Sequence, residues 1–258
     1  MRPDNRAFDA LRPVEMTAGF HRPSEGSVLY RCGATVVLCT ASIDAKVPAF
    51  LEGKGKGWLT AEYQMHPRAN PRRENRDGRG SKGLGGRTME IQRLIGRALR
   101  AAVALDKLGE KTITIDCDVL EADGGTRTAS VTGGFVALAL ALGKLQALGD
   151  LPVRILREPV AATSVGFLKN PDGESMALDL CYLEDSKAEV DLNVVATASG
   201  SIVEVQGTAE GEPVPRKHID RMMDLALKGI AELTKIQRAT IAAAGVDLAA
   251  LTMAAGEP

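Results

Sequence analysis

The segment DGGTRTAS at residues 123–130 combines several groups suited to binding an anion. Its two glycines allow a ligand to approach the backbone, and the apolar run that follows predicts a buried helix whose first N–H groups are unpaired. Thr126, Thr128 and Ser130 add hydroxyl donors, and Arg127 adds a guanidinium. The segment therefore predicts a site for one phosphate, although it lacks the spacing of a P-loop. The alternative is an ordinary glycine turn in which Thr and Ser cap the helix.

Carboxylates in the second half of the chain offer ligands for a hard cation. Asp185 and Asp191 flank the start of a predicted strand at residues 189–197, and Asn193 shares the polar face of that strand with Asp191. Asp179 lies on the preceding predicted strand. Carboxylates that converge beside a phosphate site suit magnesium. The alternative is a solvated strand edge.

Histidine and cysteine do not form a recognisable catalytic or metal-binding set. The three histidines are far apart, at His21, His66 and His218, and the four cysteines, Cys32, Cys39, Cys117 and Cys181, include no CxxC pair. The cysteines predict buried thiols in a reducing cytoplasm. The lack of a Ser/His/Asp or Cys/His set is consistent with phosphoryl-type transfer, which depends mainly on positioning and charge.

Positive charge is concentrated in residues 68–100, although the chain as a whole has a formal net charge of −1. This window has three acids against Lys82 and nine arginines: Arg68, Arg72, Arg73, Arg76, Arg79, Arg87, Arg93, Arg97 and Arg100. A basic stripe on an acidic body indicates a polyanionic partner. With nine aromatic residues in the chain, base stacking cannot dominate, so the stripe predicts contacts to a nucleic-acid backbone. The alternative is a solvated helix face, Arg93 to Arg100, and a disordered loop.

Length and composition favour a globular protein. The chain has 258 residues, of which 45% are hydrophobic and 25% charged, and we expect one domain spanning residues 1–258. The longest apolar run, residues 133–142, is about half a membrane span, and the first residues lack the apolar core of a secretion signal. We expect a cytoplasmic protein that does not bind membranes.

Periodicity predicts an α+β fold with sheet and helix layers. Strands are expected at residues 27–32 and 34–43, which form a hairpin, and at 58–65, 111–121, 161–167, 176–182, 189–197 and 202–206. Helices are expected at residues 88–108 and 215–244, and a further apolar helix is expected to follow the segment 123–130 and to run to about residue 148. In residues 111–121 the alternation places Ile113, Ile115, Cys117 and Val119 on one buried face. The phosphate segment would then join a strand to the buried helix.

Several long motifs, in this order, resemble those of the ribonuclease PH family over nearly the whole chain. They are MRPDNR at the start, KGWLTAEYQMHPRA at 56–69, GRTMEIQRLIGRALRA at 86–101, IDCDVLEADGGTRTASVTG at 115–133, LDLCYLEDSKAEVDLNVV at 178–195 and VEVQGTAEG at 203–211. The resemblance implies a ribonuclease PH-like two-layer fold that assembles as a hexameric ring, a trimer of dimers. It also implies a phosphate-dependent 3′–5′ exoribonuclease that trims tRNA precursors and other RNA 3′ ends, releases nucleoside diphosphates and can run in reverse.

The resemblance also implies roles for individual residues. Phosphate, the co-substrate, would be bound by Arg87, Gly125, Thr126 and Arg127 with help from Ser130, and a divalent metal such as Mg²⁺ by Asp185 and Asp191. Arg87, Arg127, Asp185 and Asp191 would be the catalytic set, and Arg68, Arg72, Arg73 and Arg76 would bind RNA. Asn193 stands where related polynucleotide phosphorylases carry a lysine, and the sequence leaves open what replaces that charge.

Two other functions remain open at this stage. One is a catalytically silent RNA-binding ring subunit, although Arg127, Asp185 and Asp191 are all present in the chain. The other is a hydrolytic exonuclease, which would release nucleoside monophosphates without added phosphate.

Overall fold

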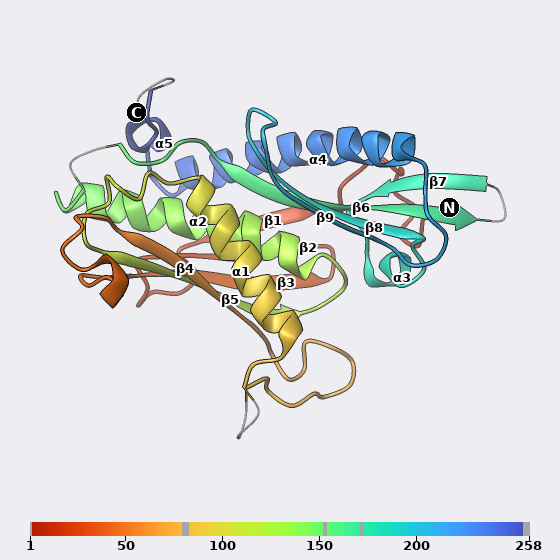
Figure 1. Ribbon diagram of the computed structural model, residues 1–258, viewed down its shortest axis with the longest axis horizontal. Coiled ribbons are helices and arrows are strands. Elements are labelled where there is room, and N and C mark those ends of the chain that lie inside the picture. Colours follow the sequence, from red (N-terminus) through yellow and green to blue (C-terminus); the bar gives the residue numbers. More distant parts are fainter. Residues whose placement is uncertain (1, 79–82, 152–153, 171–172, 255–258) are drawn as a thin grey trace.

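Two β-sheets and a buried helix between them form the framework of the protein (Figure 1). The computed structural model describes residues 2–78, 83–151, 154–170 and 173–254. In the described residues the first sheet has the order β1-β2-β3-β5-β4 and the second β7-β6-β8-β9. The mixture of helices with mainly antiparallel strands confirms the predicted α+β class.

The first sheet contains β1 (Val14–Ala18), β2 (Gly26–Cys32), β3 (Thr35–Asp44), β4 (Trp58–Met65) and β5 (Thr112–Glu121). The predicted hairpin joins β2 to β3, with Gly33 at a φ of +56° in the turn. β4 pairs in parallel with β5, and α1 (Gly86–Ala101) forms the crossover between them. The predicted alternation in β5 is confirmed, since Ile113, Ile115, Cys117 and Val119 are all buried.

Helix α2 (Thr126–Ala147) is the centre of the main core. It is buried on nearly all sides and packs on β2, β3 and β6. Among the described helices it alone has the length and composition to cross a membrane, yet 89% of that window is buried inside the protein. The apolar run therefore serves the core of this fold.

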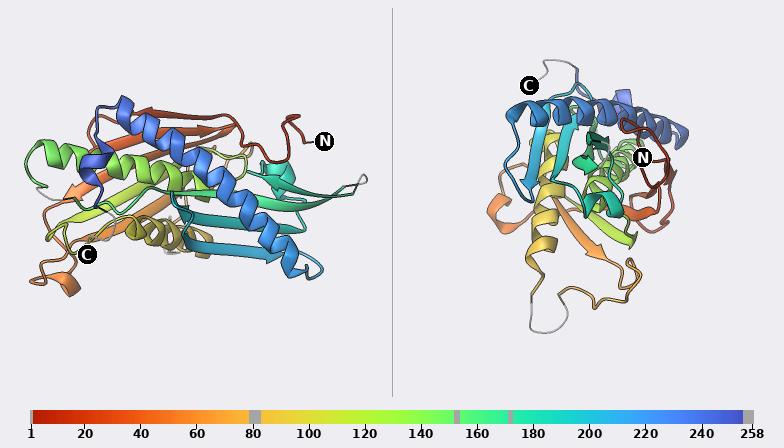
Figure 2. Two further views of the ribbon diagram at one scale, coloured as in Figure 1. Left: turned by 90° about the horizontal axis from the view of Figure 1, so that it is seen from above. Right: turned by 90° about the vertical axis from the view of Figure 1, so that its right-hand side faces the viewer.

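The second sheet contains β6 (Val160–Asn170), β7 (Gly173–Leu178), β8 (Val190–Thr197) and β9 (Ile202–Ala209). Helix α4 (Arg216–Ala243) lies across this sheet, and Figure 2 shows its diagonal course. Val190, Leu192 and Val194 of β8 pack with α4 in a second core cluster, whereas Val195 joins the cluster around α2. The second sheet is thereby held against the start of α2. Short helices α3 (Tyr182–Asp185) and α5 (Leu248–Leu251) complete the fold.

Two predicted elements end several residues earlier than expected. The helix expected at residues 88–108 ends at Ala101, because the next residues bond to a distant segment: Ala104 N donates to Ile155 O over 2.8 Å, and Arg157 N to Ala102 O over 2.8 Å. The strand expected at residues 176–182 ends at Leu178, since Asp179 has a φ of +55° and the chain then turns into α3.

Candidate active site

The first turn of α2 is open to a ligand. Its N-cap residue Gly125 has a φ of +68° and no side chain caps this helix end. The hydroxyl of Thr128 instead donates to the Gly125 carbonyl over 2.9 Å. The N–H groups of the first turn are thus left without a side-chain acceptor, which is the arrangement that binds anions.

Two further hydroxyls of the phosphate segment lie inside the protein. Thr126 shares a hydrogen bond of 2.9 Å with the hydroxyl of Tyr63, which ties the helix start to β4. Ser130 is fully buried and donates to the Thr126 carbonyl over 2.8 Å. Ser130, expected to assist phosphate binding, therefore has its hydroxyl engaged within the helix.

Arg127 faces a broad cleft of about 1120 Å³ between α1, the start of α2, α3 and the strands β8 and β9. Its guanidinium donates to Gln206 Oε1 over 3.0 Å and to Glu90 Oε1 over 3.4 Å. Arg87 lines the same cleft from the first turn of α1 and is exposed. The structure therefore brings the two predicted phosphate-binding arginines to one cleft. Sequence reasoning missed Glu90 and Gln206, although both lie in motifs that carry the family resemblance.

Asp185 and Asp191 line this cleft as well. Burial raises the pKa of Asp185, and the nearby charges of Arg87 and Arg127 oppose that rise. Burial, followed by the charge of Asp185, raises the pKa of Asp191 to about 6. A carboxylate whose charge is destabilised by burial and by a neighbouring carboxylate favours a bound cation.

The donor set fits a divalent metal. Oδ1 of Asp191 is buried and has no hydrogen-bond partner, so the carboxylate has a free oxygen for a ligand. The described residues contain no group of three or more His, Cys, Asp or Glu side chains around one point. Two carboxylates are enough for Mg²⁺, which usually keeps several waters and binds substrate phosphates.

Asp179 does not join the other two carboxylates, contrary to expectation. It is buried and ion-paired with Arg12, whose Nη2 lies 2.7 Å from Asp179 Oδ1. Although burial alone would raise the pKa of Asp179, the hydrogen bonds and charge of Arg12 hold it below its usual value. Asp179 is therefore fully engaged away from the cleft.

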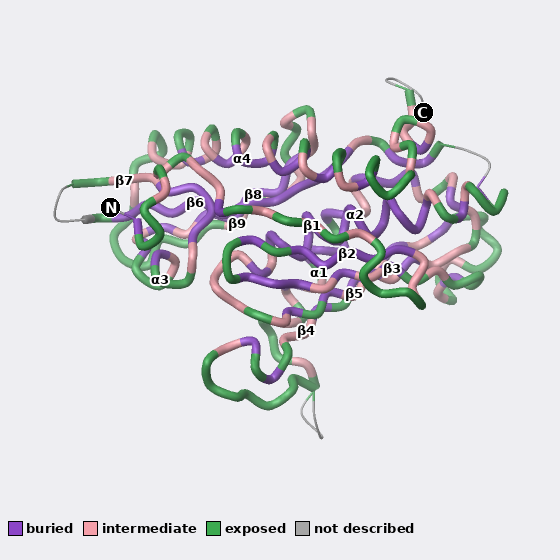
Figure 3. The backbone as a smooth tube through the Cα atoms, turned by 180° about the vertical axis from the view of Figure 1, so that it is seen from behind, coloured by how far each residue is buried: buried purple, intermediate pink, exposed green. Residues whose placement is uncertain are grey.

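The basic residues after β4 form an exposed extension, which we call the arginine loop (residues 67–85). Its described residues project from the body below α1 and are largely exposed (Figures 1 and 3). Its start is held by Ala122 N, which donates to Ala69 O over 3.0 Å, and its end by Gly85 N, which donates to Asp77 over 3.0 Å. The guanidiniums on the described part of this loop are all exposed: Arg68, Arg72, Arg73 and Arg76. Arg79 and Lys82 lie outside the described residues.

The arginines on α1 are not a uniform basic face. Arg100 donates to the Leu59 carbonyl over 2.9 Å and lies 4.9 Å from the centre of the Trp58 ring, so it braces α1 against β4. Arg97 pairs with Glu204 of β9 over 3.4 Å. Arg93, the remaining arginine of this row, is exposed and has no ion pair or hydrogen bond of this kind among the described residues. It alone in the row fits the alternative of a solvated helix face.

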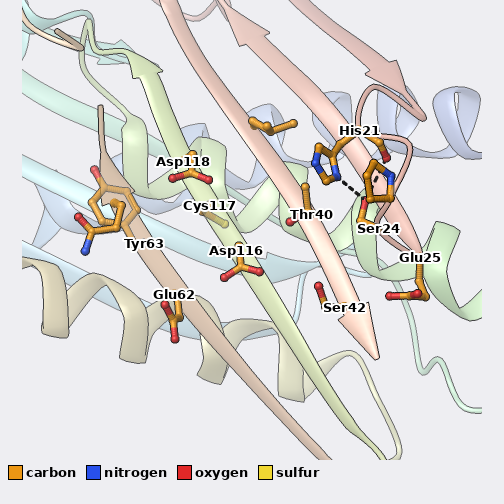
Figure 4. A pocket seen from close by; sticks show the side chains of 13 residues that line it. His21, Ser24, Glu25, Thr40, Ser42, Glu62, Tyr63, Asp116, Cys117 and Asp118 are labelled. Carbon is orange, nitrogen blue, oxygen red and sulfur yellow. Dashed lines mark hydrogen bonds between the residues drawn. The ribbon is translucent and has the colours of Figure 1, made fainter. Parts of the chain in front are cut away.

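A second hollow, on the face of the first sheet away from α1 and α2, has the opposite charge. Glu62, Asp116 and Asp118 line it together with Glu25 and His21 (Figure 4). Burial raises the pKa of Asp116, and the charges of Glu62 and Asp118 add to that rise. Such a surface repels phosphate, so the cleft around Arg127 is the candidate active site.

Comparison with known families assigns this architecture to a class of enzymes. Residues 10–142 match the first domain of the 3′ exoribonuclease family and residues 158–229 match its second domain. The chain belongs to the ribonuclease PH family of 3′ exoribonucleases. The predicted class of enzyme is thereby confirmed.

Individual relatives are similar over almost their full length. Ribonuclease PH of Bacillus pumilus is 54% identical over 240 residues, which cover 93% of this chain and 97% of the relative. Ribonuclease PH of Crocosphaera subtropica is 54% identical over 243 residues, covering 94% and 98%.

Solved structures share the fold at much lower sequence identity. Rice (Oryza sativa) Rrp46 has a TM-score of 0.73 at 18% identity and covers 93% of this chain and 100% of its own. A chain of the Archaeoglobus fulgidus exosome with RNA bound to the active site has a TM-score of 0.72 at 21% identity, with 91% of each chain covered. These likenesses confirm the ribonuclease PH-like fold.

Proposed function

We propose that the cleft around Arg127 carries out phosphorolysis of RNA 3′ ends, chiefly those of tRNA precursors. The observation that supports it most is the gathering of two arginines, an uncapped helix start and two carboxylates with raised pKa in one cleft. This set can hold an attacking phosphate and the phosphodiester it attacks.

The reaction exchanges one phosphate ester for a phosphoanhydride. An oxygen of inorganic phosphate attacks the last phosphorus of the RNA, a P–O bond forms, and the bond to the 3′ oxygen of the preceding nucleotide breaks. The products are a nucleoside diphosphate and an RNA one nucleotide shorter with a free 3′ hydroxyl, and the reverse reaction extends the RNA. Because ionised phosphate is already nucleophilic, the protein has to supply charge compensation and positioning rather than a general base.

Arg87, Arg127 and the first-turn N–H groups at Gly125 and Thr126 would hold the attacking phosphate. Their positive charge offsets the repulsion between two anions. Asp185 and Asp191 would hold a divalent cation, for which Mg²⁺ is the expected ion. When bound, this cation supplies Lewis-acid stabilisation of charge on the scissile phosphate and the leaving oxygen.

The arginine loop would guide RNA to the cleft. Arg68, Arg72, Arg73 and Arg76 are exposed, and no ion pair of theirs occurs within the described part of the chain. We propose that six chains assemble as a trimer of dimers, which would gather these loops around a shared opening. The free thiols of Cys32, Cys39, Cys117 and Cys181 support a cytoplasmic location.

A product assay tests this function. The protein is incubated with Mg²⁺ and a short RNA that has an extended 3′ tail, with and without ¹⁸O-labelled inorganic phosphate. We expect nucleoside diphosphates only when phosphate is present, with the label in their terminal phosphate. Monophosphates formed without phosphate would establish hydrolysis, and bound RNA without any product would establish a silent RNA-binding subunit.

A further inference from the structure

The N-terminal segment carries a buried ionic cluster that the reaction as described does not use. Arg2, Arg6 and Arg12 converge on Asp179 and Glu184, and the arginine side chains are at most 10% exposed. Burying several charges costs much solvation energy, which is recovered only when the geometry is tight and the remaining groups are hydrogen-bonded. A cluster of this kind is therefore well suited to holding separate segments in one arrangement.

Arg12 connects this cluster to the phosphate segment. Its Nη1 donates to the Asp123 carbonyl over 2.6 Å, while Nε and Nη2 form a two-pronged contact with Asp179 over 3.0 Å and 2.7 Å. One planar guanidinium thus joins the loop before α2 to the end of β7.

Arg2 connects the same cluster to α3. Its Nε and Nη2 donate to the two carboxylate oxygens of Glu184 over 2.7 Å and 2.8 Å. Glu184 also accepts from Cys181 N over 3.1 Å, which fixes the start of α3. The next residue along the chain is Asp185, so the contact sets the place of a predicted metal ligand.

The phosphate segment and α3 also touch directly. Asp123 Oδ1 accepts from Tyr182 N over 3.1 Å. Gly124 lies so close that a Cβ atom there would be 2.5 Å from the Leu180 carbonyl oxygen. The two segments are separated by more than fifty residues in sequence, and this contact together with the arginine cluster determines their spacing.

We infer that Arg2 and Arg12 are positioning residues that hold the phosphate-binding turn of α2 and Asp185 at a fixed separation. The inference rests on the proposed function of this cleft. Attack of one phosphate on another depends strongly on the distance between the groups that hold them, and a misplacement of about 1 Å can cost a hundredfold in rate. The N-terminal segment would thus set catalytic geometry without contacting the substrate.

The principal test is Arg12→Lys, which retains the charge but cannot contact Asp123 and Asp179 simultaneously through a planar fork. In the full-length protein we expect kcat to fall by about tenfold to a hundredfold and the KM for phosphate to rise, with the Kd for RNA unchanged. Hydrogen exchange, which does not depend on activity, should be faster at the amides of Tyr182 and Asp185. Rates are taken per folded molecule, well below the melting temperature.

Arg216→Lys is the matched control. Arg216 pairs with Asp220 on the surface of α4 over 3.5 Å, and the two side chains are 91% and 59% exposed. This variant should retain the kinetics and the exchange pattern of the unmodified protein.

If Arg12→Lys does not fold, Asp123→Ala tests the inference instead. The Asp123 side chain is 34% exposed, and this change removes its link to Tyr182 and its 3.9 Å ion pair with Arg12. The backbone carbonyl at position 123 can still accept from Arg12, and the contacts of Arg12 with Asp179 are not altered directly. It should produce the same shifts at smaller amplitude. Unchanged kcat, KM and exchange in Asp123→Ala, or in a folded Arg12→Lys, would overturn the inference. Absence of diphosphate product from the unmodified protein would overturn the proposed function instead, and hydrogen exchange would still test the coupling.

Discussion

Asn193 donates a hydrogen bond from Nδ2 to Oδ2 of Asp191 over 2.9 Å, while Oδ1 of the same carboxylate is buried without a partner. Both residues lie on β8, with side chains on the same face of the strand. Asn193 is thus a neutral hydrogen-bond donor beside this carboxylate. It orients the carboxylate and leaves one oxygen free for a ligand in the cleft.

The raised pKa of Asp191 predicts a specific dependence of stability on pH. The pKa is about 6 in the folded protein and about 4 in an unfolded chain. Between these values the folded state binds more protons, so the free energy of unfolding falls as pH rises through this window. In metal-free protein, Asp191→Asn should therefore raise the free energy of unfolding at pH 7.5 by about 1 kcal/mol, allowing for solvent in the cleft.

Urea denaturation in the presence of a chelator measures this effect. The gain should disappear at pH 4, where Asp191 is protonated in the folded protein. Asp220→Asn, an exposed change on α4, serves as the control. An equal loss of stability at both pH values would show that Asp191 has a structural role.

Asp191 should be essential for turnover but not for RNA binding. In Asp191→Ala we expect no detectable phosphorolysis, because the variant lacks a proposed metal ligand, and a Kd for RNA close to that of the unmodified protein. Binding of Mn²⁺, followed by its electron paramagnetic resonance signal, should be lost as well. A parallel loss of RNA binding would contradict this assignment.

Arg127→Lys should weaken the use of phosphate more than the binding of RNA. A lysine retains the charge but not the two-pronged contact of a guanidinium, so the KM for phosphate should rise at least about tenfold. Initial rates at varied phosphate concentration measure it. Arg97→Lys, in which the exposed partner of Glu204 is changed, should leave this KM unaltered.

Replacement of Arg68, Arg72, Arg73 and Arg76 with alanine should weaken RNA binding and reduce its salt dependence. Each lost contact to single-stranded phosphate should lower the log–log slope of affinity against salt by about 0.7. Fluorescence anisotropy at several salt concentrations gives the slope. The control replaces four exposed cations of α4, Arg216, Lys217, Arg221 and Arg238. An unchanged slope in the loop variant would mean that the loop is merely solvated.

The proposed ring predicts a definite mass in solution. Light scattering at micromolar concentration should give six times the chain mass of 27.3 kDa. A monomer under these conditions would contradict the hexamer. A stable dimer would show that only one of the two interfaces of a trimer of dimers has formed.

Local periodicity predicted most of the elements that build the site. The alternation in β5, the apolar sequence of α2 and the glycine turn between β2 and β3 could all be recognised, because each reflects interactions within a few residues. Family motifs then indicated Arg87, Arg127, Asp185 and Asp191, and the structure places all four in one cleft.

The sequence by itself therefore determined the α+β class, the buried central helix, the basic loop and the residue types needed for phosphate chemistry. Tertiary structure decided which groups meet. Asp179 pairs with Arg12 across 167 residues, and Glu184 pairs with Arg2 across 182. The end of α1 likewise depends on hydrogen bonds to residues 155–157. These pairings depend on how the two sheets pack around α2. A pattern within a short window of sequence therefore cannot predict them.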